Sequence, residues 1–468
     1  MCSFLVLLNK LYLNLNHNYL LKYLKLRGPD ETNVINFKEY TFIHNLLHIC
    51  GKKTLQPFFS NNIIALLNGE IYNYKDFDSK YESDGECIIE LYEKYGQQFS
   101  KKLYGEFAIV IFDYNKNKII LCSDIFSTKP IFYYYDPKLK FIISSLRRTI
   151  VDNIKNVNVD NIIKLEANTC ISLDFENNLI EKNNIYEFNL KQYKTTYDDF
   201  IRALENAINI RICNNNNNNT HFICLSSGYD SGTISLVLKN LNHKFKSYTI
   251  LAKDSKKIID ERLNFDKKYN NNTYIELTKK LYDENKNYVS KNIDDYEIKY
   301  KVYEDFTCER NEKNFKLINW NQSSDAGTIG INHIFNIANK EGYRIYLSGH
   351  GADEIFCDYG AYNKGFVRNS QLKGYFPENL NDVFPWNNFY DGTMKMFISK
   401  EEGIASLYGI ETRYPFLDKH VVQEFLNLSQ ELKNNSYKGP LSYYMKKYNY
   451  PFEEDIKIGF KCHKRLKD

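Results

Sequence analysis

The chain has 468 residues, which is long enough for two or three domains with full hydrophobic cores. Its 62 lysine and arginine residues nearly balance 58 acidic residues, and the net charge of +4 gives no indication of a nucleic-acid partner. Ten cysteines are scattered without a Cys-x-x-Cys pair, which favours reduced thiols in the cytoplasm over a disulfide framework or a zinc site.

The apolar start of the chain is short, no basic segment precedes it and no small-residue cleavage site follows it. We therefore expect no signal peptide. No run of about 18 apolar residues occurs elsewhere, so we also expect no membrane span. Both absences favour a cytoplasmic protein.

Cys2 follows the initiator methionine, and this position carries chemical information. Removal of Met1 would leave one residue with both a thiol and a free α-amine, and the amine can act as the base for its own thiol. Cys2 alone does not decide between a nucleophile and a chance occurrence. A turn signal, Arg27-Gly-Pro-Asp30, comes next.

Several strand and turn motifs follow. An apolar strand over 63–67 runs into Asn68-Gly-Glu, and Ser83-Asp84-Gly-Glu86 begins a helical pattern. Two further apolar strands, over 103–113 and 118–122, are joined by a hairpin turn.

In this order and at these spacings, the motifs resemble the glutaminase domain of class II glutamine amidotransferases, in particular that of asparagine synthetase, over roughly residues 2–150. The resemblance implies an αββα N-terminal-nucleophile fold. It implies that Cys2 attacks the side-chain amide of glutamine, and that the Asn68 side chain and the Gly69 N–H form the oxyanion hole. Donors preset toward the oxygen that gains charge are worth about 3 kcal/mol each. Glu70 and Asp84 match the acids that hold the glutamine α-amino group.

Three positions depart from this pattern. Leu46 stands at the glutamine-binding position where the family carries an arginine that grips the α-carboxylate. His48 or another residue is left open as the source of that cation. Ser127 replaces a usual glycine, and Ser145 replaces a usual glutamate.

The middle of the chain separates two regions. The weak periodicity of segment 155–195 predicts a linker, and the asparagine run 214–219 predicts a surface loop. Between them, apolar positions from Tyr197 to Ile208 predict an amphipathic helix.

A short apolar run over 222–225 then ends in small residues, and a helical pattern follows it. A strand, a tight loop and a helix N-terminus form an anion site, where backbone N–H groups converge and serine hydroxyls add donors. Asp230 would repel a bare phosphate, so it favours a site with Mg²⁺, which shares phosphate oxygens with carboxylates. For this stretch alone, a serine-rich turn with an N-capping aspartate is the alternative.

The loop lacks the Gly-x-x-x-x-Gly-Lys pattern of the Walker motif. It resembles the pyrophosphate loop, Ser-Gly-Gly-x-Asp-Ser, of N-type ATP pyrophosphatases, with Ser227 in place of the first glycine. The resemblance implies adenylation of a carboxylate by ATP with release of pyrophosphate. It assigns to ATP and pyrophosphate the loop residues Leu225, Ser226, Ser227, Gly228, Asp230 and Ser231.

Strands and helices alternate after this loop. Strands over 245–251, 273–277 and 343–347, with a helix beginning at Asp260, predict a parallel sheet with helices on both faces. In the resembled family this is an adenine nucleotide α-hydrolase-like (PP-loop) domain, in which the backbone of Leu225 and of the strand ending near Ile250 holds the adenine.

A second loop of small residues and acids follows the strand over 343–347. Asp353 is well placed to be a second magnesium ligand opposite Asp230, and the resemblance assigns Ser348 and Gly349 to ATP. His350 stands where the family has a glutamate beside the forming amide. A histidine can do base work there because its pKa lies near neutrality. A histidine that only packs beside the loop is the alternative, and the departure leaves the acid substrate open.

The C-terminal region carries further matches. The stretch Gly409–Asp418 is similar to the family's Glu-x-Arg-x-Pro-Phe-Leu-Asp segment, with Glu402 where an aspartate is usual. Lys438 matches the family's Lys-x-x-Leu, and Lys457 its Lys-x-Gly-Phe. The resemblance implies that one of these lysines offsets charge on the phosphates or the adenylate.

The sequence therefore predicts a class II glutamine amidotransferase domain of the α+β class over 1–185 and an ATP-dependent synthetase domain of the α/β class over 190–468. The expected reaction uses ATP and Mg²⁺ to convert aspartate, with ammonia from glutamine, to asparagine, glutamate, AMP and pyrophosphate. An amide ligase for another carboxylate or amine and a degenerate, non-catalytic scaffold are the alternatives. A homodimer and the use of free ammonia both stay open.

Overall fold

The computed structural model describes residues 2–155, 157–212, 221–252, 254–293, 298–303, 315–320, 325–358, 372 and 375–456, with the backbone alone for 298–303 and 315–320. Lys457 and the asparagine run lie outside the described residues. The chain divides into two compact units. One comprises residues 1–187 with 405–411, and the other comprises most of the remaining chain.

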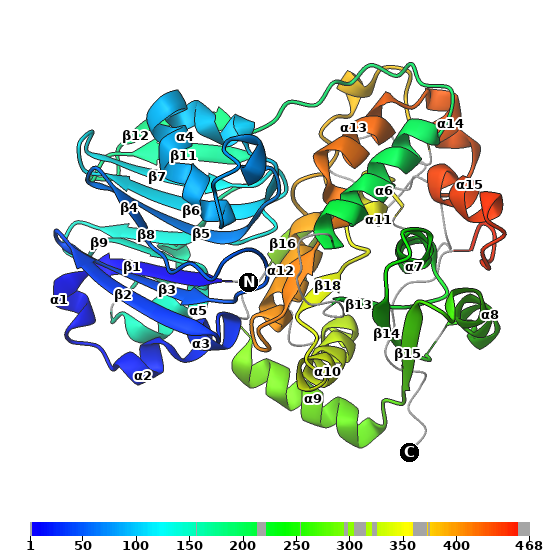
Figure 1. The fold of residues 1–468 in the computed structure, drawn as a ribbon, viewed down its shortest axis with the longest axis horizontal. Helices are drawn as coiled ribbons and strands as arrows, with labels where there is room; N and C mark the ends of the chain where they lie inside the picture. Colours follow the sequence, from blue (N-terminus) through cyan, green and yellow to red (C-terminus); the bar gives the residue numbers. More distant parts are fainter. Residues whose placement is uncertain are drawn as a thin grey trace. The chain divides into compact units, whose positions relative to one another are not determined.

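Two six-stranded sheets make up the first unit, and the strand pairs within them are antiparallel (Figure 1). In sheet order, the strands of the first are β10 (Ile163–Lys164), β8 (Phe132–Asp136), β9 (Lys140–Ser144), β1 (Ser3–Leu8), β3 (Tyr40–Leu46) and β2 (Glu31–Phe37). Those of the second are β12 (Leu179–Asn184), β11 (Thr169–Leu173), β7 (Lys118–Ser123), β6 (Gly105–Asp113), β5 (Ile63–Ile71) and β4 (Phe58–Ser60).

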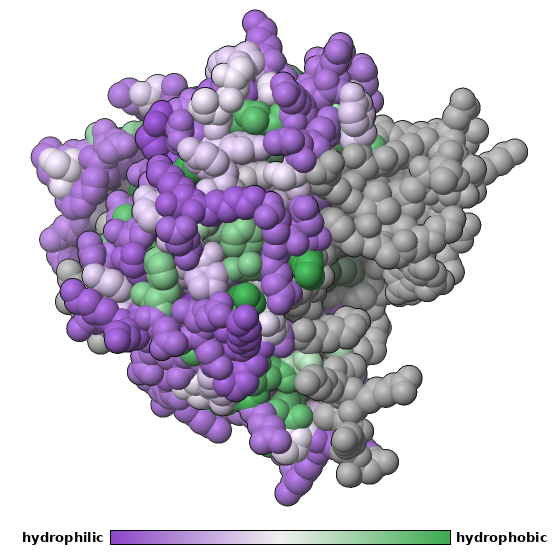
Figure 2. Space-filling model, turned by 90° about the vertical axis from the view of Figure 1, so that its right-hand side faces the viewer, coloured by the Kyte–Doolittle hydropathy of each residue, from purple (hydrophilic) through white to green (hydrophobic). Residues whose placement is uncertain are grey.

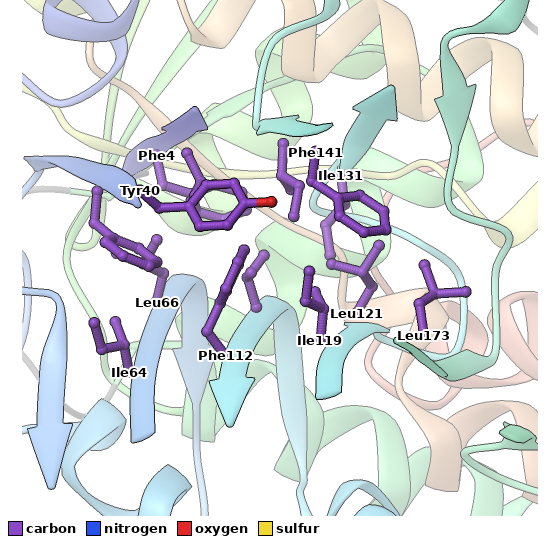
Figure 3. Packing of buried hydrophobic residues seen from close by; sticks show 14 of the residues in the cluster. Phe4, Tyr40, Ile64, Leu66, Phe112, Ile119, Leu121, Ile131, Phe141 and Leu173 are labelled. Carbon is purple, nitrogen blue, oxygen red and sulfur yellow. The ribbon is translucent and has the colours of Figure 1, made fainter. Parts of the chain in front are cut away.

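The main core of this unit lies between its two sheets, as Figure 3 shows. Alternate side chains of each strand point to this layer. Phe42 of β3 and Phe112 of β6 meet there edge to face, with ring centroids 5.1 Å apart. Both rings are fully buried, so each removes a large apolar area from water.

Helices cover the outer faces of the two sheets. A second core packs α4 (Cys87–Tyr95) against the sheet that contains β5. On the other sheet, α3 (Lys22–Arg27) lies against β1 and β3, and α5 (Arg147–Asn153) lies against β9. The short helices α1 (Asn9–Tyr12) and α2 (His17–Leu20) complete this layer. The four layers confirm the predicted αββα fold.

The prediction of a linker over 155–195 was wrong up to Glu187, because the segment belongs to the first unit as far as that residue. It contains β10, β11 and β12, and β11 pairs with β7 inside the second sheet. All residues of β11 are buried. A strand covered on both faces loses the alternation of apolar and polar residues that identifies a half-buried strand, which explains its weak sequence signal.

The second unit contains a five-stranded sheet in the order β15-β14-β13-β18-β19. The pairs β13–β14, β13–β18 and β14–β15 are parallel, which confirms the predicted parallel sheet. The strands are β13 (His221–Cys224), β14 (Phe245–Ile250), β15 (Asn270–Ile275), β18 (Ile345–Leu347) and β19 (Glu411–Arg413). A separate antiparallel pair joins β16 (Ile298–Tyr303) and β17 (Phe315–Trp320).

Helices connect the strands of this unit. They are α6 (Asp198–Ile212), α7 (Tyr229–Asn240), α8 (Lys256–Asp266), α9 (Lys279–Asn292), α10 (Ala326–Lys340), α11 (Ala352–Ile355), α12 (Thr393–Ala405), α13 (Lys419–Asn427), α14 (Gln430–Asn435) and α15 (Gly439–Lys447). The α8 helix begins at Lys256, capped by Ser255, rather than at Asp260 as predicted. Likewise β15 begins three residues earlier than the predicted strand at 273.

The topology of the parallel sheet positions the two loops that the sequence singled out. Strand β13 leads through residues 225–228 into α7, and β18 leads through residues 348–351 into α11. Because β13 and β18 are parallel neighbours, both loops lie at the same edge of the sheet.

Within the part of the chain that the structure describes, no helix combines the length and the apolar character needed to cross a membrane. On the face displayed in Figure 2, the hydrophobic residues form small groups that hydrophilic residues separate.

Candidate functional sites in the two units

In the first unit, Cys2 immediately precedes β1 and is buried. Its Sγ lies 3.9 Å from the carbonyl oxygen of Leu47, to which the thiol donates a weak hydrogen bond. Burial raises the pKa of the Cys2 thiol to about 12. The thiol therefore stays protonated near neutral pH, and it needs a nearby base to act as a nucleophile.

The backbone of Cys2 is held by two buried polar side chains. Arg27 Nε donates to the Cys2 carbonyl oxygen at 3.0 Å. The Asn68 amide, in the orientation that satisfies both of its neighbours, donates to the same oxygen at 2.7 Å and accepts from Arg27 Nη2 at 3.3 Å. These contacts fix Cys2 next to Asn68. This role of Arg27 was not predicted from the sequence, where the residue is identified only as part of a turn motif.

Gly69 is a position that only glycine fits. Its φ is +127°, and an added Cβ would lie 2.0 Å from the backbone oxygen of Glu106 on the neighbouring strand. Asn68, directly before it, is fully buried. The backbone at the end of β5 is thus fixed, as a preset oxyanion hole requires.

Asp84 and Glu70 lie near the same end of β5. Asp84 Oδ2 accepts from the N–H of Ile71 at 2.9 Å, and burial raises the pKa of Asp84 to about 6. Glu70 is half-buried. Leu46 ends β3 and is buried. Its apolar side chain supplies no positive charge for the glutamine α-carboxylate. The His48 ring instead lies with Nε2 3.0 Å from the Gly51 carbonyl oxygen.

In the second unit, the loop after β13 is closed by its own polar groups. The N–H of Ser226 donates to Ser231 Oγ at 3.0 Å, and that of Gly228 donates to Ser226 Oγ at 3.2 Å. The N–H of Ser227 donates to Asp254 Oδ1 at 2.6 Å, and Ser227 Oγ donates to the same oxygen at 2.9 Å. The converging N–H groups expected from the sequence are therefore present, and side chains already engage them.

Two carboxylates and a lysine meet beside this loop. Lys438 Nζ lies 2.5 Å from Asp230 Oδ1 and 2.8 Å from Asp353 Oδ1. The Lys438 side chain is almost fully buried, and the two carboxylates raise its pKa well above the ordinary value against the effect of burial. The ammonium is therefore charged, and it balances two acids that are close enough to share one cation.

Two carboxylates at one site match the preferences of Mg²⁺, which takes one or two protein carboxylates together with phosphate oxygens and water. Asp230 and Asp353 supply the two carboxylates. Among the residues that the structure describes, no group of three or more His, Cys, Asp or Glu side chains forms a cage for a metal. The site thus fits a magnesium ion that a phosphate would complete, and it does not fit a structural metal.

His350 lies in the loop after β18. Its Nδ1 is 2.8 Å from Glu401 Oε1 on α12, and its ring stacks on Phe397 with centroids 5.1 Å apart. The contact has the distance of an ion pair, although His350 Nδ1 does not meet the geometric criteria for a hydrogen bond. The Glu401 side chain is 1% exposed. No feature of the sequence pointed to Glu401, because nothing in α12 marks it as a partner of this loop.

The remaining predicted residues surround the same sheet edge. Ser348 Oγ accepts from the His350 N–H at 3.0 Å. At Gly349, an added Cβ would lie 3.0 Å from the Asp230 Cβ, so the two loops touch. The N–H of Leu225 donates to the Tyr248 carbonyl at 2.9 Å, and Ile250 ends the neighbouring strand. The structure thus brings all described members of the predicted ATP site together, and Lys457 lies outside the described residues.

The chain is similar to several known proteins. A family profile described as "Glutamine amidotransferase domain" matches residues 1–200. The chain is 27% identical to a putative asparagine synthetase [glutamine-hydrolyzing] 1 of Methanocaldococcus jannaschii, over 88% of this chain and 77% of that protein. It is 22% identical to asparagine synthetase B [glutamine-hydrolyzing] of Escherichia coli, over 87% of this chain and 71% of that protein. A shorter match, 38% identical over 23% of this chain and 16% of the other, is to asparagine synthetase [glutamine-hydrolyzing] 2 of Bacillus subtilis.

The cation between Asp230 and Asp353 yields a prediction about metal binding. We expect Lys438→Met to lower the melting temperature, by about 2–4 °C for each kcal/mol lost in a unit of this size, because two neighbouring acids lose their counter-charge. MgCl₂ should then raise the melting temperature of the variant more than that of the wild type, because the ion can occupy the place of the ammonium. Thermal melts with MgCl₂, against NaCl at equal ionic strength, measure this. An equal response of both proteins would contradict the shared cation site.

Proposed function

We propose that this chain belongs to the glutamine-hydrolysing asparagine synthetase family and makes asparagine from aspartate with ATP and with ammonia released from glutamine. The first unit hydrolyses glutamine at Cys2. The second unit binds Mg-ATP at the sheet edge that holds Asp230 and Asp353, and it converts the β-carboxylate of aspartate to β-aspartyl-AMP. Ammonia then displaces AMP, and glutamate and pyrophosphate are the other products.

The main support for glutamine hydrolysis in the first unit is the fixed backbone around Cys2. Arg27 and Asn68 both bind its carbonyl oxygen, and Gly69 cannot accept a side chain. Cys2 is thereby held next to Asn68 and Gly69, whose N–H groups would be the preset donors for an oxyanion. Removal of Met1 would give Cys2 the α-amine that its raised pKa calls for as a base. Glu70 and Asp84 supply negative charge for the α-ammonium of glutamine.

Support for the synthetase half comes from Lys438 and its two acids. When Mg-ATP binds, Asp230 and Asp353 would hold the metal, which screens phosphate charge, and Lys438 would pair with phosphate oxygens. Ser226, Ser231 and Ser348 place hydroxyl groups beside the same loops. This arrangement suits in-line loss of pyrophosphate better than transfer of the terminal phosphate, for which the Walker loop would be expected.

Removing one centre at a time tests the two-site assignment. Cys2→Ala should abolish glutamine hydrolysis and leave ammonia-dependent asparagine synthesis near the wild-type rate, because only the thiol is lost. Asp353→Asn should abolish pyrophosphate release with either nitrogen donor and leave glutaminase activity in place. Glutamate, asparagine and pyrophosphate are measured in parallel. Loss of both activities in folded Cys2→Ala protein would contradict the assignment.

The raised pKa of Asp84 predicts the pH dependence of glutamine use. Burial raises the pKa of this acid to about 6, so the carboxylate that pairs with an α-ammonium is present above that pH and is protonated below it. We expect kcat/KM for glutamine to fall about tenfold per pH unit below pH 6. Asp84→Asn should lower kcat/KM throughout and remove this acid limb. An unchanged limb in the variant would assign the titration to another group.

A second candidate is an amide ligase of the same class that acts on another carboxylate. The specific observation in its favour is the pair of His350 and Glu401, which replaces the single glutamate expected beside the forming amide. In this pair an imidazole stands at the position where the resembled family has a carboxylate. Pyrophosphate release measured over a panel of amino and keto acids distinguishes the two candidates.

The same pair yields a prediction about the rate of the synthetase reaction. If His350 accepts a proton from the attacking nitrogen, loss of its ring should slow the ammonia-dependent reaction. His350→Gln should lower kcat by about 10²–10⁴-fold. His350→Glu should restore part of the rate. A small effect of His350→Gln would show that the ring only packs on Phe397.

A further inference from the structure

Arg262 is a fully buried arginine beneath the loop that follows β13. Its Nη1 donates to the carbonyl oxygens of Ser226 at 2.6 Å and of Gly228 at 2.9 Å. Its Nε donates to the carbonyl oxygen of Pro451 at 2.8 Å. One guanidinium thus joins α8, the loop and the segment after α15.

The surroundings of Arg262 do not balance its charge. Among the residues that the structure describes, no carboxylate lies within ion-pair distance of it, and its Nη2 is buried without a hydrogen-bond partner. Asp254 and Asp266 are the acids whose charges act on it from a greater distance. A buried cation without a paired carboxylate lowers the stability of the folded state, so its position beside the predicted anion-binding loop needs a physical explanation.

The sequence leaves room for this guanidinium in the first turn of α7. A Cβ on Gly232 would lie 2.5 Å from Arg262 Cζ. On the other side, the guanidinium carbon lies 5.2 Å from the centroid of the Tyr450 ring. The Tyr450 hydroxyl donates to Asp266 Oδ2 at 2.9 Å. Glycine on one side and an aromatic face on the other fix the plane of the guanidinium.

The contacts with the two carbonyls have a geometric consequence. In a trans peptide unit the C=O and N–H point in opposite directions. Because Arg262 binds the Ser226 and Gly228 oxygens, the N–H groups of Ser227 and Tyr229 point away from it. The Tyr229 N–H belongs to the first turn of α7, where donors have no partner within the helix. Such donors are the ones that bind anions.

We propose that Arg262 is the positioning residue of the pyrophosphate loop: through the Gly228 carbonyl it orients the Tyr229 N–H group toward the phosphates of ATP, and it adds a buried positive charge on the opposite side of the loop. This inference rests on the proposed ATP-dependent function. It gives the unpaired cation its counter-charge, which is the bound polyphosphate rather than a protein carboxylate.

The test measures binding of Mg-ATP to the full chain by calorimetry, without an acceptor acid or a nitrogen donor. Arg262→Lys keeps the charge and loses the fork that binds both carbonyls. We expect its Kd for Mg-ATP to rise about 10- to 100-fold, as for a displaced binding group. In steady state, KM for ATP should rise by a similar factor, while glutamine hydrolysis stays unchanged.

Arg211→Lys is the matched control. Arg211 is also buried in the second unit, but it pairs with Asp418 at 2.8 Å and donates to the Ala207 carbonyl at 2.9 Å. The same substitution there should lower the melting temperature and leave Kd for Mg-ATP unchanged. If both variants weaken ATP binding equally, Arg262 has only a structural role and the proposal is overturned.

Gly232→Ala provides an independent variant that keeps Arg262 itself. The new methyl group would displace the guanidinium, so we expect weaker ATP binding, intermediate between the wild type and Arg262→Lys. This variant decides the question if Arg262→Lys fails to fold. Wild-type affinity in folded Arg262→Lys, or in Gly232→Ala when the former is unfolded, overturns the proposal. Absence of ATP binding by the wild type would instead refute the proposed function.

Discussion

The ion pair of Lys438 with Asp230 and Asp353 is the interaction on which the second unit's site depends. Its three members come from segments far apart in the sequence: the start of α7, the start of α11 and the residue before α15. Two acids that close together cannot both be ionised without a cation between them. The parallel pairing of β13 with β18 brings the acids to one sheet edge, and Lys438 makes that proximity stable.

Arginine plays a comparable part in both units. Arg27 binds the carbonyl oxygen of Cys2, and Arg262 binds those of Ser226 and Gly228. In each unit a buried guanidinium binds backbone carbonyl oxygens. It therefore fixes the direction of the peptide groups beside a chemically important residue. A guanidinium suits this role because its N–H groups lie in one rigid plane.

The sequence predicted those parts of the two sites that are formed by short runs of consecutive residues. A strand that ends in small residues followed by an acid identifies a loop by itself, so the sequence predicted Asp230 and Asp353 as site residues, and the structure places both beside Lys438. Arg262 was seen only as a residue of a helix start, because its function comes from Pro451 and Gly228 packing around it. Glu401 and Arg27 were missed for the same reason. The strand β11 was missed because it is buried on both faces.

Ser227 shows how a departure from a motif is accommodated. A glycine there would lack the hydroxyl, whereas Ser227 donates both its N–H and its hydroxyl to Asp254 Oδ1, and its Oγ also accepts from the N–H of Ser255 at 3.1 Å. Burial raises the pKa of Asp254, and the two donors of Ser227 oppose that rise. The Asp254 carboxylate thus accepts a hydrogen bond from the Ser227 N–H, which would otherwise be available to a phosphate. Under the proposed function, ATP must compete with Asp254 for that N–H. The Tyr229 N–H, on the peptide group that Arg262 orients through Gly228, then becomes the more available donor of the loop.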